Sequence, residues 1–188
     1  MNKAMKFKAI ISILAISYIT PAEAGSQISL QCPGLKMSLQ DYTELGAQVD
    51  RSRDSGVSDA ELRRVESLFL AALDVCAREE NWTSKERDAA EQYALMDAAM
   101  SSMRMVFALH GLGNIDPLFE TIPKLNDDQI MSLAKGDAVA SGALDAVISD
   151  LKLRKINMDY ADAAIQKDLE SIFAAAIKKA MWQGAFTS

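Results

Sequence analysis

The chain has 188 residues, of which 20 are basic and 26 are acidic, so its formal net charge is −6 at pH 7. This length suits one domain of ordinary size with a real hydrophobic core. An acidic chain without a basic stripe argues against binding to nucleic acid or to anionic membrane surfaces, because binding to both depends largely on neutralising their negative charge. We therefore expect neither as a partner.

Residues 1–24 match a secretory signal peptide. Three lysines precede an apolar run from Ala9 to Ile19, and the sequence Ala22-Glu23-Ala24 supplies a cleavage site of the small-x-small type. The apolar run is shorter than the roughly 20 residues that span a bilayer. We predict cleavage after Ala24, which removes three lysines and Glu23 and changes the net charge from −6 to −8. Residues 25–188 should then form a single domain without a membrane span, located in the periplasm or secreted.

Cys32 and Cys76 are the two cysteines of the chain. In an exported protein such a pair favours a disulfide bond over two free thiols. Neither cysteine has a histidine or another cysteine at the spacing of a metal site or a CxxC redox centre. The sequence therefore predicts one disulfide and no cofactor.

The first half of the mature chain predicts a short extended lead-in followed by two helices. The lead-in covers residues 25–34. Ser38 is a suitable N-cap for the first helix, and Ser58 with Glu61 forms a possible capping box for the second. Apolar residues in the second helix recur three or four positions apart up to Cys76, which places that cysteine on its inner face.

A long helix between Thr83 and Gly111 is the expected centre of the fold. Thr83 and Glu86 match a capping box, and Gly111 matches a left-handed C-cap. One face of this helix carries the apolar residues Ala89, Tyr93, Met96, Met100, Met103 and Phe107. A helix with such a face must be covered by other helices.

The helical period is lost from Leu112 to Pro123 and resumes after Asn126 or Asp127. Three further helices are expected, the first ending near Gly136, the second covering about 139–156, and the last running from about 157 to Gly184. Alternation of period two is absent, so no strand is expected. The predicted fold is all-α, an irregular bundle of five to six helices around one long central helix.

The methionine face and the carboxylates are the two candidates for chemistry. Met96, Met100 and Met103 share a face with His110, a pattern that could bind Cu(I), although core packing explains it better. An acidic pair such as Asp127-Asp128 could serve a hydrolase, but acids at a helix start are expected from the helix dipole alone.

Two regions suit the binding of a partner. The segment Leu112–Pro123 carries much apolar surface for a connection between helices, and aromatic residues lie near the end of the last helix. The candidate contact residues are Leu112, Ile115, Leu118, Phe119, Ile122, Trp182 and Phe186. The alternative is that the bundle covers the segment and that the two C-terminal aromatics fold back onto it.

The composition and the compartment together favour a binding protein over an enzyme. We expect an exported helical protein that binds another protein, for example as an inhibitor, an immunity protein or an accessory of an envelope assembly. If electrostatic steering contributes to binding, the partner is basic. The alternatives are a carboxylate-dependent hydrolase of cell-envelope substrates and a Cu(I)-binding protein. No motif assigns an activity, and the sequence leaves the oligomeric state open.

Overall fold

The computed structural model describes residues 21–51, 59–139 and 142–187. The predicted leader up to residue 20 and the capping residue Ser58 lie outside these ranges. The helices are α2 (Pro21–Lys36), α3 (Leu39–Arg51), α4 (Asp59–Glu79), α5 (Ser84–Leu109), α6 (Asp116–Phe119), the 3-10 helix η1 (Ile122–Lys124), α7 (Asp127–Lys135), α8 (Ala143–Leu153) and α9 (Ala163–Phe186). No strand occurs in the described ranges, which confirms the all-α prediction.

The described chain forms two compact units. We call residues 21–102 with 178–187 the disulfide unit, and Met103–Ile177 the α6–α8 unit. Helices α5 and α9 each contribute residues to both units.

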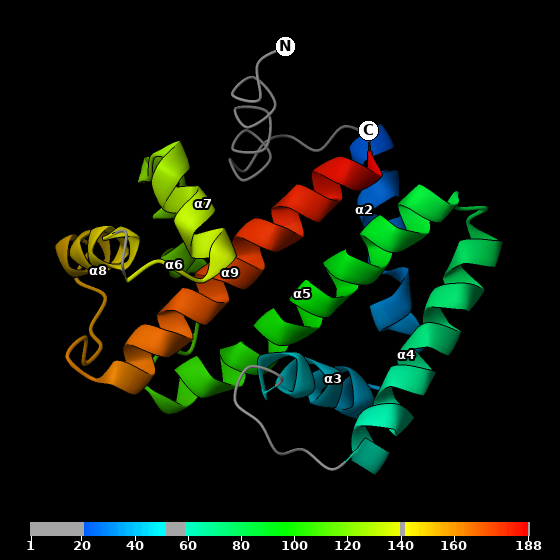
Figure 1. The fold of residues 1–188 in the computed structure, drawn as a ribbon, viewed down its shortest axis with the longest axis horizontal. Helices are drawn as coiled ribbons and strands as arrows, with labels where there is room; N and C mark the ends of the chain where they lie inside the picture. The colour runs from blue at the N-terminus through cyan, green and yellow to red at the C-terminus, as the bar shows by residue number, and fades with distance from the viewer. Residues whose placement is uncertain (1–20, 52–58, 140–141, 188) are drawn as a thin grey trace. The chain divides into compact units, whose positions relative to one another are not determined.

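Helix α4 contacts both α2 and α3 in the disulfide unit. Helix α3 packs on its N-terminal half and α2 on its C-terminal half (Figure 1). The first contact buries an apolar cluster of Leu45, Val65, Phe69, Ala94 and Ala98. A second cluster contains Leu30, Leu73, Ala90 and Tyr93. Both clusters include residues of α5. The apolar residues of α5 in this unit are therefore covered by other helices, as its apolar pattern requires.

The α6–α8 unit has its own core. Helix α7 packs on α8 (Figure 1). Glu170 of α9 accepts a 3.0 Å hydrogen bond from the backbone N–H of Ala138, which holds the chain just after α7 to α9. The fully buried side chains of this unit include Phe107, Leu118, Ile122, Leu133, Val147, Leu151, Leu169, Ile172 and Phe173.

Three of the predicted helix starts, at Ser38, Thr83 and Asn126, are confirmed by their hydrogen bonds. The Glu86 carboxylate accepts from the backbone N–H of Thr83 at 2.7 Å, and Thr83 Oγ1 accepts from the Glu86 N–H at 3.2 Å. Ser38 Oγ accepts from the N–H of Asp41 at 3.1 Å. Asn126 forms a capping box with the residue three positions on, Gln129. These contacts satisfy N–H groups that have no partner within the helix.

Helix ends are confirmed at two glycines and corrected elsewhere. Gly111 and Gly136 have φ values of 85° and 79°, the left-handed conformation expected at a C-cap. The extended lead-in predicted for 25–34 is wrong, because these residues belong to α2. Helix α8 is shorter than the predicted 139–156. Helix α9 begins at Ala163 instead of near 157, and it continues past Gly184 to Phe186. None of the helices in the described part of the chain is long and apolar enough to cross a membrane.

Candidate functional site

The disulfide joins α2 to α4. Cys32 and Cys76 are bonded, with their Cα atoms 5.9 Å apart, which confirms the predicted pair. Cys76 is fully buried, as its position on the inner face of α4 requires. The bond closes a loop across 44 residues and holds α2 against the helix on which it packs.

The segment Leu112–Pro123 packs largely into its own unit. Ile115, Leu118 and Ile122 are buried, while Leu112 and Phe119 are half-buried. The Phe119 ring contacts Phe173 edge to face, with the ring centroids 6.2 Å apart. In this conformation three of the five apolar side chains of the segment are not at the surface, so a partner would reach only the other two.

A polar network explains how the segment is held to α8. The Asp150 carboxylate accepts hydrogen bonds from Thr121 Oγ1 at 2.7 Å, Lys124 Nζ at 2.6 Å and Arg154 Nε at 2.9 Å. Arg154 also donates to Glu120 Oε2 at 2.9 Å and to Thr121 Oγ1 at 2.8 Å. Burial alone would raise the pKa of Asp150, but the hydrogen bonds from Lys124, Thr121 and Arg154 outweigh it and lower the pKa. A general acid needs the opposite shift, so the surroundings of Asp150 do not suit that role.

The C-terminal aromatics differ in exposure. Phe186 contacts the Trp82 ring edge to face at 5.6 Å, and Trp82 Nε1 donates to Ser29 Oγ at 2.9 Å. Trp182 is partly exposed, with 36% of its surface accessible. Phe186 therefore fastens the end of α9 within the disulfide unit, and Trp182 is the member of the pair that a partner could touch more readily.

The methionine face is mostly inside. Met100 and Met103 are buried, and Met96 is half-buried. His110 Nε2 lies 3.9 Å from Asp168 Oδ2, which is too long for a hydrogen bond. Within the described residues, no three His, Cys, Asp or Glu side chains converge in a way that could hold a metal ion.

A second polar network, which the sequence patterns did not indicate, links α3, α5 and α9 within the disulfide unit. Tyr42 Oη donates to Asp97 Oδ2 at 2.9 Å and to the carbonyl of Ala94 at 3.1 Å, and Lys179 donates to Asp97 Oδ1. Burial and the Asp97 charge raise the pKa of Tyr42 well above its ordinary value. Burial would lower the pKa of Lys179, but Tyr93 and Asp97 outweigh it and raise the pKa. The Lys179 ammonium thus remains charged and paired with Asp97.

The outer face of α3 carries the most exposed large apolar side chain among the described residues of the disulfide unit. Leu39 is 82% exposed, and Leu35 at the end of α2 is 74% exposed. A shallow hollow of about 670 Å³ runs along this face and is lined by Leu39, Gln40, Thr43, Glu44 and Ala47. We call these five residues with Leu35 the α3 surface. Arg64 of α4 pairs at 2.8 Å with Glu44, the only charged residue of the α3 surface, and at 2.8 Å with Asp41.

The α3 surface was not predicted from the sequence, which singled out Leu112–Pro123 instead. The spacing of Leu39, Tyr42, Leu45 and Val49 predicts that Leu39 lies on the inner face of the helix that starts after Ser38. This prediction is wrong for Leu39, because its side chain is 82% exposed. The chain matches no known family model, no curated protein and no solved structure.

Proposed function

We propose that the protein is exported and that it binds another protein through the α3 surface. The observation that carries the proposal is the exposure of Leu39, which is 82% accessible although it belongs to a helix with a buried inner face. Surface leucines scattered singly are ordinary, but Leu39 also lines the hollow, and the exposed Leu35 precedes it by four residues in the chain. The centres of protein interfaces are depleted of charged residues, and the α3 surface carries one charge that is already paired.

Export is supported by the leader pattern and by the disulfide. The Cys32–Cys76 bond is typical of oxidising compartments such as the periplasm and the cell exterior. The predicted cleavage after Ala24 falls in the first turn of α2, ahead of both Leu35 and the disulfide. The mature chain therefore keeps the whole α3 surface.

The partner we propose is a protein, with a basic surface around an apolar centre. The charge of −8 after cleavage would attract a basic protein and raise its association rate at low salt, while the apolar contact would set its dissociation rate. An inhibitor or immunity protein and an accessory of an envelope assembly both fit this description.

Affinity capture with two matched variants tests the proposal. The tagged full chain is expressed in its own cells, recovered from the envelope fraction and compared with Leu39→Asp and Leu109→Asp. Leu109 is 89% exposed and belongs to the α6–α8 unit, so its variant adds the same charge at an equally open site. Aspartate at the first position of α3 suits the helix dipole, so Leu39→Asp should not weaken the fold.

The expected result is that wild type and Leu109→Asp recover the same protein and that Leu39→Asp loses it without a fall in melting temperature. Retention by Leu39→Asp would remove the α3 surface from the proposal. Loss in both variants would show a general effect of added charge and would also count against it. Intact-mass analysis of the exported chain checks the cleavage after Ala24.

A further inference from the structure

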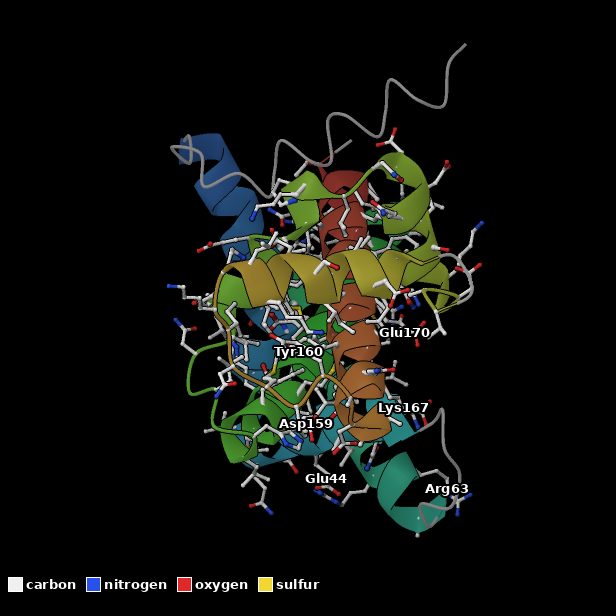
Figure 2. All side chains as sticks on the ribbon, turned by 90° about the vertical axis from the view of Figure 1, so that its left-hand side faces the viewer. Glu44, Arg63, Asp159, Tyr160, Lys167 and Glu170 are labelled. Atoms are coloured by element: carbon white, nitrogen blue, oxygen red, sulfur yellow. A yellow bond between two sulfur atoms is a disulfide. The ribbon has the colours of Figure 1, made fainter. Side chains whose placement is uncertain are left out.

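A second hollow lies in the α6–α8 unit, at the C-terminal end of α8. Its volume is about 440 Å³, and it is lined by Lys152, Lys155, Ile156, Asn157, Met158 and Tyr160. Figure 2 shows Tyr160 and its neighbour Asp159 in the segment that leads from α8 to α9. The lining contains two ammonium groups, one side-chain amide and no carboxylate, although the chain as a whole is acidic.

The backbone places Lys155 in this hollow at a conformational cost. The N–H of Lys155 bonds to the carbonyl of Lys152 at 3.0 Å, and the N–H of Ile156 bonds to the carbonyl of Leu151 at 3.0 Å. This pattern ends a helix with a left-handed residue, and Lys155 has a φ of 59°. Helices α5 and α7 place glycine at the same position, namely Gly111 and Gly136.

Lysine is a poor choice for that conformation, because its Cβ crowds the backbone where glycine has none. Within the described chain one other residue besides glycine has a positive φ, Asn81, and asparagine tolerates the left-handed region. Residues other than glycine that are held in this conformation cost free energy, and they cluster at functional sites such as ligand clamps. The feature that Lys155 supplies and glycine would lack is an ammonium group beside the hollow.

Lys152 is also held in place. Its Nζ lies 5.4 Å from the centroid of the Tyr160 ring, within the range of a cation–π contact. The ring is fixed in turn, because Tyr160 Oη donates to the carbonyl of Ile156 at 2.6 Å. Among the residues that the structure describes, no carboxylate forms an ion pair with Lys152 or Lys155, whereas Lys124, Arg154 and Arg64 are all paired.

We infer that this hollow binds a small organic carboxylate with an apolar body. The two ammonium groups and the Asn157 amide donate hydrogen bonds to the carboxylate. Ile156 and Met158 provide apolar contact for the rest of the ligand. The flexible methionine side chain can adapt to ligands of different shape. This site lies in the other unit from the α3 surface and does not depend on the proposed protein partner.

Titration of the isotope-labelled full chain with three probes tests the site, with backbone amide shifts of residues 152–160 as the readout. The probes are phenylacetate, acetate and inorganic phosphate. We expect saturable shifts with phenylacetate and binding about tenfold weaker for acetate, which lacks the apolar body. Absence of saturable shifts would overturn the inference. Phosphate binding as tightly as phenylacetate would overturn the assignment of the ligand class.

Lys155→Gly separates a binding role from a structural one. Glycine relieves the left-handed strain, so the melting temperature should rise by about 2–4 °C while the phenylacetate shifts are lost. A variant that melts lower, or that binds phenylacetate as well as wild type, would contradict the inference. Lys135→Gln is the control, since Lys135 is an exposed lysine of the same unit outside the hollow. It should bind phenylacetate like wild type.

Discussion

Gly46 of α3 lies directly against the backbone of Ala98 on α5. A Cβ placed on Gly46 would lie 1.9 Å from the carbonyl oxygen of Ala98 and 2.4 Å from its carbonyl carbon. Both atoms belong to helix backbone, so neither can move aside as the end of a flexible side chain could. The absence of a side chain at Gly46 is therefore what allows α3 to approach α5 this closely.

Gly46→Ala should destabilise the protein. Alanine is favoured over glycine in a helix by about 1 kcal/mol, but overpacking against backbone costs about 1–3 kcal/mol or more, so the clash should decide the sign. Chemical denaturation measures the difference. Gly113→Ala is the control, because no atom lies within 4 Å of a Cβ added there, and its free energy of unfolding should hardly change. A Gly46→Ala variant that is more stable than wild type would show that the two helices are not in this contact.

Loss of the disulfide should cost about 2–4 kcal/mol in the free energy of unfolding. Cys76→Ala removes the bond to Cys32 and leaves α2 attached to α4 by apolar contacts and the surface ion pair of Lys36 with Glu79. Denaturation of Cys76→Ala beside wild type gives the difference, and non-reducing peptide mapping checks the bond itself. Full labelling of both cysteines as free thiols would rule the bond out.

Leu118→Asp should destabilise by about 3 kcal/mol or more. Leu118 is fully buried in the α6–α8 unit, and a carboxylate there would have no partner. Leu109→Asp, at an exposed site, should cost less than about 1 kcal/mol, most of it from placing a negative charge at a helix C-terminus. Thermal melting of both proteins makes the comparison. An unchanged melting temperature for Leu118→Asp would instead favour the expectation that Leu112–Pro123 faces a partner.

The local part of the fold could be predicted from the sequence. The capping contacts of Thr83 with Glu86 and of Asn126 with Gln129 join residues three positions apart, so the pattern contains both partners. Gly111 can adopt the left-handed conformation because glycine has no Cβ, and this does not depend on any other residue. The disulfide was predictable because the chain offers a single pairing.

The long-range part could not be predicted. Helix α2 has a weak apolar pattern and contains Pro33, so its helical conformation depends on packing against α4 and on the disulfide. The burial of Leu112–Pro123 depends on Thr121 meeting Asp150, 29 residues away. The contact of Lys179 with Asp97 spans 82 residues, and no spacing in the sequence indicates such a pair.

The Asp150 network predicts a loss of stability in acid. Because the pKa of Asp150 is lower in the folded state than its ordinary value of 3.8, its contribution is present above that value and is lost as pH falls through the folded pKa. Asp150→Asn should cost about 1.5–3 kcal/mol at neutral pH, the usual range for a hydrogen bond to a charged group. Below about pH 4 the difference in the free energy of unfolding between wild type and variant should become smaller.

Denaturation curves of wild type and Asp150→Asn across that pH range check this prediction. Asp145→Asn is the control, because Asp145 is an exposed carboxylate of the same helix for which the structure gives no ion-pair partner among the described residues. If the free energy of unfolding of Asp150→Asn differs from that of wild type by the same amount at every pH, the network does not stabilise the Asp150 carboxylate.

Photo-crosslinking at Gln40 tests the α3 surface most directly. Gln40 is exposed and lines the hollow, so a photoreactive amino acid placed there should crosslink one protein in intact cells. The control position is Glu80, exposed at the end of α4 away from its contact with α3, and it should give no such product. A crosslinked product at position 40 that disappears when Leu39→Asp is added is the predicted result. The absence of any product at position 40, or the same product at position 80, would contradict binding through the α3 surface.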